Sequence, residues 1–135
     1  MMKIVLDTNI FISGIFWEGN YCSQIIDSWR NGKVVLISSP EIVQELVVTL
    51  RDFKIKMSEE MINQWRDMII ENSKMVIPEF KLDIVKDDLS DNKFFEAAVV
   101  GEADYIVSQD KHLLKVKEYG EVKVINPEDF VKLFD

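Results

Sequence analysis

Short hydrophobic runs alternate with longer amphipathic segments along this chain. Runs rich in Val and Ile predict five buried β-strands, at 4–6, 34–37, 75–77, 105–107 and 122–125. The segments between them repeat apolar residues three and four positions apart, which predicts α-helices. Strands that alternate with helices are typical of an α/β fold with a mainly parallel sheet.

Capping residues set the limits of several predicted helices. Ser39, Ser58 and Asn126 each precede an amphipathic segment, and they predict helices over about 40–50, 59–72 and 127–134. Gly32 and Gly101 fit positions just beyond helix ends. Repeats, low-complexity tracts and linkers are absent from the sequence, so we expect one domain over residues 1–135.

Composition narrows the class of protein. Hydrophobic residues make up 47% of the 135 residues and charged residues 30%, which is ordinary for a globular domain. Cys22 is the only cysteine, so an intrachain disulfide is impossible and a reducing compartment is favoured. Apolar runs are too short for a membrane span, and Asp7 interrupts the first one before it could act as a signal peptide. We therefore expect a cytoplasmic protein without a membrane partner.

The charge balance is acidic. With 24 Asp and Glu against 16 Lys and Arg, the formal net charge is −8. This argues against a large surface that coats nucleic acid without regard to sequence. Carboxylates that converge on metal ions, however, would present a weaker negative field to a substrate than the formal count suggests.

Acidic residues interrupt the hydrophobic pattern where strands end. Asp7 directly follows the first predicted strand, and Asp110 follows the fourth. In open parallel sheets, ligands bind at the carboxyl ends of the strands, where the strand order reverses. If the first and fourth strands are neighbours across that reversal, these two carboxylates face each other.

Four acids from separate segments each allow a structural and a chemical interpretation. Asp7 fits a helix N-cap, and Glu45 fits a solvated strip of its helix. Asp91 shares a helix face with buried residues, and there a first-turn acid and a carboxylate in a crevice are equally good explanations. Asp110 fits a turn in which Ser108 is a local hydrogen-bond partner. Their convergence at one edge of a sheet favours a site.

The residue types restrict the chemistry of such a site. His112 is the only histidine and Cys22 the only cysteine, so a typical zinc site has little support. Oxygen ligands alone suit Mg²⁺ or Mn²⁺, which are the usual equipment of phosphodiester hydrolysis. Neither GxxxxGK[ST] nor GxGxxG occurs, which argues against a nucleoside-triphosphate enzyme.

The motifs around these acids resemble those of PIN-domain nucleases. They are, in chain order, LDTN with Asp7, SPEIVQEL with Glu45, DLSDNKFFEAA with Asp91, ADYIVSQDKHLL with Asp110, and the closing INPEDFVKLF. The resemblance spans nearly the whole chain in the correct order. It implies an α/β/α domain with five strands in the order 3-2-1-4-5, a metal-dependent ribonuclease activity and, as in many prokaryotic relatives, the role of toxin in a toxin–antitoxin pair.

Site residues follow from the same resemblance. It implies that the acidic metal ligands are Asp7, Glu45, Asp91 and Asp110. Polar side chains that support them would be Thr8, Asn9 and Ser108. Gln109 departs from the small or basic residue that relatives often have there. A cation that pairs with Asp7 would explain why a carboxylate lies inside a hydrophobic segment.

We therefore expect an endoribonuclease that depends on Mg²⁺ or Mn²⁺. Candidate RNA-binding residues are Arg51, Lys54, Lys56, Lys111 and Lys115, although solvated side chains explain most of them individually. A cognate antitoxin and a homodimer are further partners to consider.

Ile62, Trp65 and Ile69 could form the face of such a dimer, and core packing explains them equally well. The main alternative function is a catalytically weak or inactive PIN-like module that binds protein. A haloacid-dehalogenase-like phosphatase would also begin with an Asp after the first strand. It would need a second Asp where Asn9 stands.

Overall fold

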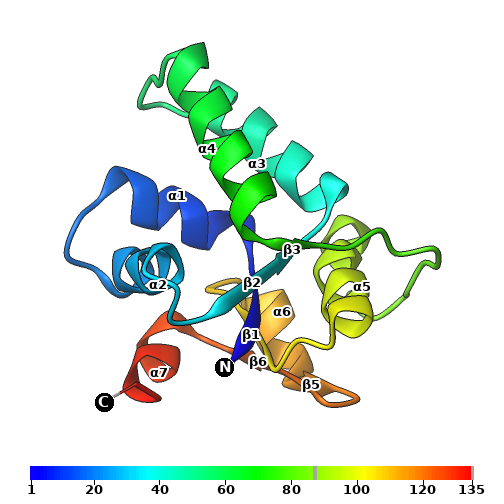
Figure 1. Ribbon diagram of the computed structural model, residues 1–135. Coiled ribbons are helices and arrows are strands. Elements are labelled where there is room, and N and C mark those ends of the chain that lie inside the picture. The colour runs from blue at the N-terminus through cyan, green and yellow to red at the C-terminus, as the bar shows by residue number, and fades with distance from the viewer. Residues whose placement is uncertain (87, 135) are drawn as a thin grey trace.

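The computed structural model describes residues 1–86 and 88–134. Its strands are β1 (Lys3–Leu6), β2 (Val35–Ser38), β3 (Lys74–Met75), β4 (Tyr105–Val107), β5 (Glu118–Tyr119) and β6 (Val122–Ile125). Its helices are α1 (Thr8–Phe16), α2 (Tyr21–Arg30), α3 (Pro40–Asp52), α4 (Glu59–Asn72), α5 (Asn92–Gly101), α6 (Lys111–Val116) and α7 (Pro127–Lys132), with a 3₁₀ turn, η1 (Leu89–Asp91), before α5 (Figure 1).

The strands form one sheet in the order β3-β2-β1-β4-β6-β5. Every neighbouring pair is parallel except β5 and β6, which form an antiparallel hairpin. The predicted order 3-2-1-4-5 holds for the five expected strands, and β5 is an addition to it. Glu118 and Tyr119 are both exposed and give no hydrophobic pattern, so their pairing depends on the turn at Gly120, where φ is +60°.

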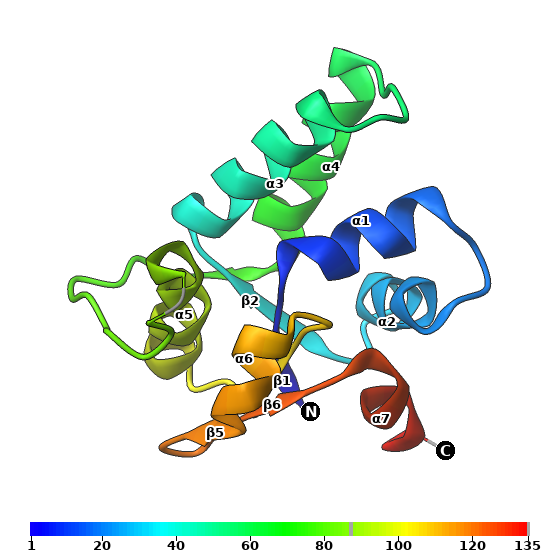
Figure 2. The ribbon, with the colours of Figure 1, turned by 180° about the vertical axis from the view of Figure 1, so that it is seen from behind.

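Helices cover both faces of this sheet. Ile4 and Leu6 of β1 belong to a hydrophobic cluster with residues of α1, α2, α3 and α4, and Phe130 of α7 joins the same cluster. Val5, between them in sequence, belongs to a second cluster formed with α5 and α6. Figures 1 and 2 show α2 and α7 on one side of the strands and α5 and α6 on the other. The expected three-layer α/β/α arrangement is therefore confirmed.

The predicted caps are present, with one correction. The side chains of Ser39, Ser58 and Asn126 each accept a hydrogen bond from a backbone N–H in the first turn of their helices. Gly101, expected beyond the end of a helix, is instead the last residue of α5. An added Cβ there would lie 2.5 Å from Cγ2 of Ile37, so glycine is required for close packing of α5 on β2.

The α3–α4 hairpin extends from the sheet in both views (Figures 1 and 2). Ile62 and Ile69 of α4 are buried in the first hydrophobic cluster, and Trp65 packs against that cluster. Core packing is thus the correct interpretation of the two isoleucines, and the expectation that they offer a dimer face is wrong. None of the helices in residues 1–86 and 88–134 combines the length and hydrophobicity that a membrane span requires.

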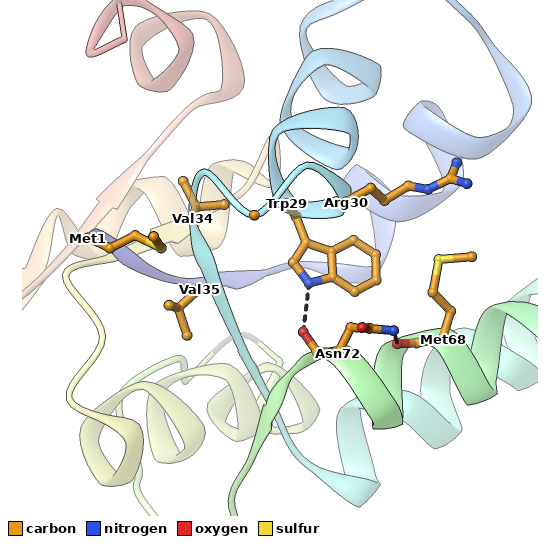
Figure 3. Close-up of a pocket in the computed structure, with 8 residues that line it drawn as sticks. Met1, Trp29, Arg30, Val34, Val35, Met68 and Asn72 are labelled. Atoms are coloured by element: carbon orange, nitrogen blue, oxygen red, sulfur yellow. Dashed lines mark hydrogen bonds between the residues drawn. The ribbon is translucent and has the colours of Figure 1, made fainter.

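A cavity of about 380 Å³ lies where the strands begin (Figure 3). Its walls include Val34, Met68 and the indole of Trp29, whose Nε1–H donates to the backbone oxygen of Asn72 at 3.0 Å. This bond ties α2 to the end of α4. Because β1 and β2 are parallel and this cavity lies at their amino ends, it is on the opposite edge of the sheet from Asp7.

Candidate active site

Four acidic side chains converge where the order of the strands reverses. β1 and β4 are parallel neighbours, with Leu6 opposite Val107, so the chain leaves both strands at the same edge. Asp7 lies between β1 and α1, Asp110 lies between β4 and α6, Asp91 precedes α5, and Glu45 is in the second turn of α3. The starts of these helices surround that edge in Figure 2. The expectation that Asp7 and Asp110 follow neighbouring strands where the strand order reverses is confirmed.

Asp7 is buried and is held by the neighbouring strand. Its Oδ2 accepts a hydrogen bond of 2.7 Å from the hydroxyl of Ser108. It is the N-cap residue of α1, but its side chain makes no capping hydrogen bond of standard geometry to that helix. Burial raises the pKa of Asp7 above its ordinary value, and the charges of Asp110 and Glu45 add to the rise. The Ser108 hydroxyl and the nearby backbone N–H of Asn9 oppose it.

Asp91 is the acid that the protein leaves least compensated. Only 8% of the residue is exposed, and its Oδ2 is buried without a hydrogen-bond partner among the described residues. It precedes α5 without making a capping bond to it. Burial raises the pKa of Asp91 to about 7, with further contributions from the charges of Asp88, Asp7 and Asp110. An acid in these surroundings is stabilised by a cation far more than by its protein neighbours.

Asp110 combines a structural and a potential chemical role. Its Oδ1 accepts a hydrogen bond of 2.7 Å from the backbone N–H of His112, which caps α6. Its own backbone N–H donates to the Ser108 hydroxyl at 2.9 Å. Ser108 therefore connects the two aspartates, since the same oxygen donates to Asp7. The expected local partnership of Ser108 and Asp110 is present.

Glu45 is only partly solvated, with 32% of its side chain exposed. Its Oε2 accepts a hydrogen bond from the hydroxyl of Thr8. Its Oε1 lies 2.7 Å from the Nζ atom of Lys93. Thr8 and Lys93 thus engage both oxygens of a carboxylate that the sequence suggested as a metal ligand, and that role of Glu45 stays a prediction.

Lys93 is the residue that the sequence analysis missed. Its side chain is 5% exposed and pairs with Glu45 across 48 positions of sequence. The sequence carried no clear signal for it, because a lysine in this half-polar segment, DNKFFEAA, is equally compatible with a solvated helix face. Only the structure shows that residues 91–98 are all buried. A buried lysine requires a carboxylate partner.

Asn9 and the five predicted RNA-binding residues differ in how close they lie in sequence to the four acids. The Asn9 side chain is exposed, and Asn9 acts on Asp7 through its backbone N–H, which lowers the pKa of that carboxyl. Arg51 pairs with Glu59 at 2.6 Å, which commits its guanidinium to α4. Lys54 and Lys56 are exposed in the α3–α4 connection, whereas the exposed Lys111 and Lys115 are on α6, directly after Asp110. Of the predicted RNA-binding residues, Lys111 and Lys115 are therefore the best placed for a substrate at the site.

The donor set fits a hard divalent cation. It consists of carboxylate and hydroxyl oxygens, which suit Mg²⁺ or Mn²⁺, and it includes the unpartnered Oδ2 of Asp91. Among the described residues, no three His, Cys, Asp or Glu side chains are arranged as a ready-made metal-binding group. The side chains that could hold an ion are those of Asp7, Asp91 and Asp110, with Glu45 as the fourth predicted ligand.

These features define a class of α/β/α domain with carboxylates at the switch point of a parallel sheet. Residues 3–112 match the family model described as PIN domain, so the chain belongs to the PIN-domain family. This range includes all four acids and ends within α6.

Most of the chain aligns with a curated protein and with chains of solved structures. The chain is 26% identical to the uncharacterized protein MJ1680 of Methanocaldococcus jannaschii, with 99% of this chain and 92% of the relative aligned. The fold of the present chain is similar to that of a chain in FitAB bound to an IR36 DNA fragment, with a TM-score of 0.63 and 16% identity. The match covers 92% of this chain and 94% of the FitAB chain. The fold is also similar to that of a chain of VapBC2 from Rickettsia felis, solved with a DNA fragment from its promoter. The TM-score is 0.61 and the identity 15%, and the match covers 93% of this chain and 98% of the other.

Proposed function

We propose that this protein is an endoribonuclease that hydrolyses RNA phosphodiester bonds with Mg²⁺ or Mn²⁺. The observation that carries the proposal is the buried, unpartnered Oδ2 of Asp91 beside the charges of Asp7 and Asp110, in a domain whose family consists generally of nucleases. A carboxylate cluster with this much unrelieved repulsion has a use when it binds a cation.

The residues of this chain have separable tasks in that reaction. Ser108 holds Asp7 and connects it to Asp110, which keeps the two carboxylates at one edge of the sheet. Lys111 and Lys115 supply positive charge for RNA phosphates close to the site. A bound divalent ion supplies charge neutralisation at the phosphate and makes water in contact with it more acidic.

An antitoxin is the partner that we propose for this nuclease. The support is the resemblance of its motifs to those of prokaryotic PIN-domain toxins, together with the likeness of its fold to chains of FitAB and VapBC2, each solved with a DNA fragment. The reading frame beside the gene provides the first test. A small DNA-binding protein encoded there, which co-purifies with this chain and inhibits its cleavage, is the expected result. Its absence would favour RNA processing or decay instead.

Catalysis is tested by separating turnover from binding. Single-turnover cleavage and equilibrium binding of single-stranded RNA are measured with Mn²⁺, with Mg²⁺ and with a chelator. We expect Asp7→Asn to abolish cleavage while RNA affinity changes little, because the carboxylate acts on the reaction rather than on substrate binding. A variant without the lysines at 111 and 115 should show the reverse, with weaker binding and a flatter dependence on salt.

Two results would overturn this proposal. The first is that several RNA substrates remain intact with the wild-type protein under every metal condition. The second is that Asp7→Asn, shown to be folded by circular dichroism, cleaves as fast as wild type. Either result would favour the protein-binding module as the function of the chain.

A further inference from the structure

Lys93 is enclosed at the edge of the acidic site. Its Nζ atom lies 2.7 Å from Oε1 of Glu45 and donates to the backbone oxygen of Ser90 at 2.6 Å. The same atom lies 5.1 Å from the ring centroid of Phe94. A carboxylate, a carbonyl oxygen and an aromatic face are the three kinds of partner that stabilise a buried ammonium group. The protein therefore keeps a positive charge at this position.

The acids of the site divide into two groups on this basis. Glu45 has a cation on one oxygen and the Thr8 hydroxyl on the other, so its charge is already compensated. Asp91 has a buried oxygen without a hydrogen-bond partner among the described residues, and the charge of Lys93 offsets only a small part of the rise in its pKa. Asp7 receives only neutral donors. Unrelieved negative charge is thus concentrated on the aspartate side of the site.

We infer that Lys93 is a positioning residue that fixes Glu45 and serves as a permanent second cation, so that the aspartates take one divalent ion. This inference rests on the metal-dependent function proposed above. It assigns Glu45 to the ammonium group of Lys93 and leaves Asp7, Asp91 and Asp110 as the ligands. A fixed charge of +1 at this place also limits affinity, because it repels a divalent ion bound nearby.

A purely structural role for Lys93 predicts a different result. If the pair with Glu45 only fastens α5 to α3, its loss would lower the stability of the metal-free protein and leave metal affinity unchanged or weaker. Under our inference, the loss of Lys93 lowers stability and strengthens metal binding, because it frees a carboxylate and removes a repulsive charge. The sign of the change in affinity therefore separates the two roles.

The experiment is a calorimetric titration of the whole chain with MnCl₂, with thermal unfolding of each metal-free variant in parallel. We expect the wild type to bind one Mn²⁺ per chain. Lys93→Met should bind Mn²⁺ at least about tenfold more tightly and unfold at a lower temperature, since it leaves Glu45 without its counter-ion. Lys93→Arg should retain wild-type affinity within about threefold, because it keeps the charge. Lys86→Met, which removes an exposed lysine paired with Asp83, is the matched control and should change neither property.

A second pair of variants covers the case in which Lys93→Met does not fold. The double variant Glu45→Gln/Lys93→Met removes both charges, and we expect it to bind Mn²⁺ at least about tenfold more tightly than Glu45→Gln alone, which keeps the lysine. Two Mn²⁺ ions of similar affinity in the wild type would overturn the inference. So would equal or weaker binding after loss of Lys93 in both comparisons. No Mn²⁺ binding to the wild type would instead overturn the metal-dependent function itself, and the inference with it.

Discussion

Replacing Asp91 with Asn tests directly whether this carboxyl is a ligand or a structural residue. The substitution keeps the shape of the side chain and removes its charge. Asp91 is 8% exposed, makes no capping bond to α5 and has one buried oxygen without a partner among the described residues. Its ionised form is therefore costly in the metal-free protein, so its removal should stabilise the fold.

The magnitude follows from the pKa of Asp91. Burial raises it from an ordinary 3.8 to about 7. Because the pKa is higher in the folded than in the unfolded state, the Asp91 carboxyl does not lower the free energy of unfolding below about pH 4. The loss of stability grows as the pH rises to about 7, and it is constant above that pH. The full difference between the two pKa values corresponds to a loss of about 4 kcal/mol in the free energy of unfolding at pH 8. The buried amide of Asn offsets part of this gain, so we expect Asp91→Asn to be more stable by about 2 kcal/mol.

Urea unfolding in the presence of a chelator measures this effect. The free energy of unfolding is compared for wild type and Asp91→Asn at pH 5, 6, 7 and 8, and the gain should grow along the series. Glu79→Gln, which removes the same charge from an exposed loop position, is the control and should show no such growth. RNA cleavage should be lost in Asp91→Asn at every pH. A variant less stable than wild type at pH 8 that still cleaves RNA would make Asp91 a structural residue and refute this reasoning.

Three further predictions concern the same structure. Millimolar Mn²⁺ or Mg²⁺ should raise the melting temperature of the wild type by several degrees through binding to the folded state, and scanning fluorimetry should show no such rise for Asp7→Asn. Ser108→Ala should slow single-turnover cleavage about 10- to 100-fold by releasing Asp7 and Asp110, and an unchanged rate would contradict their connection through this hydroxyl. Gly101→Ala should lower the free energy of unfolding by about 1–3 kcal/mol because its Cβ meets Ile37, whereas equal urea midpoints would show that α5 can shift to make room.

The sequence by itself determined most of the local elements and their order, although not the hairpin strand β5. The unbroken apolar run of Ile4, Val5 and Leu6 predicts a strand buried on both faces, because successive side chains point to opposite sides. Ser39 and Ser58 were sufficient to locate the starts of α3 and α4, since a cap satisfies backbone groups of its own first turn. Interactions between residues that are a few positions apart can be predicted from the sequence without knowledge of the tertiary structure.

Tertiary structure decided which acids are compensated. Lys93 and Glu45 are 48 positions apart, and their pairing depends on how α5 and α3 pack on the sheet. Ser108 reaches Asp7 across 101 positions because β1 and β4 are neighbours. The sequence offered a capping role and a ligand role for Asp91 as equals. The structure shows no capping bond from this side chain to α5 and a buried oxygen without a partner among the described residues, which supports the proposed ligand role. Charge compensation is a property of three-dimensional proximity, since Coulomb energy depends on distance in space and on local polarity rather than on sequence separation.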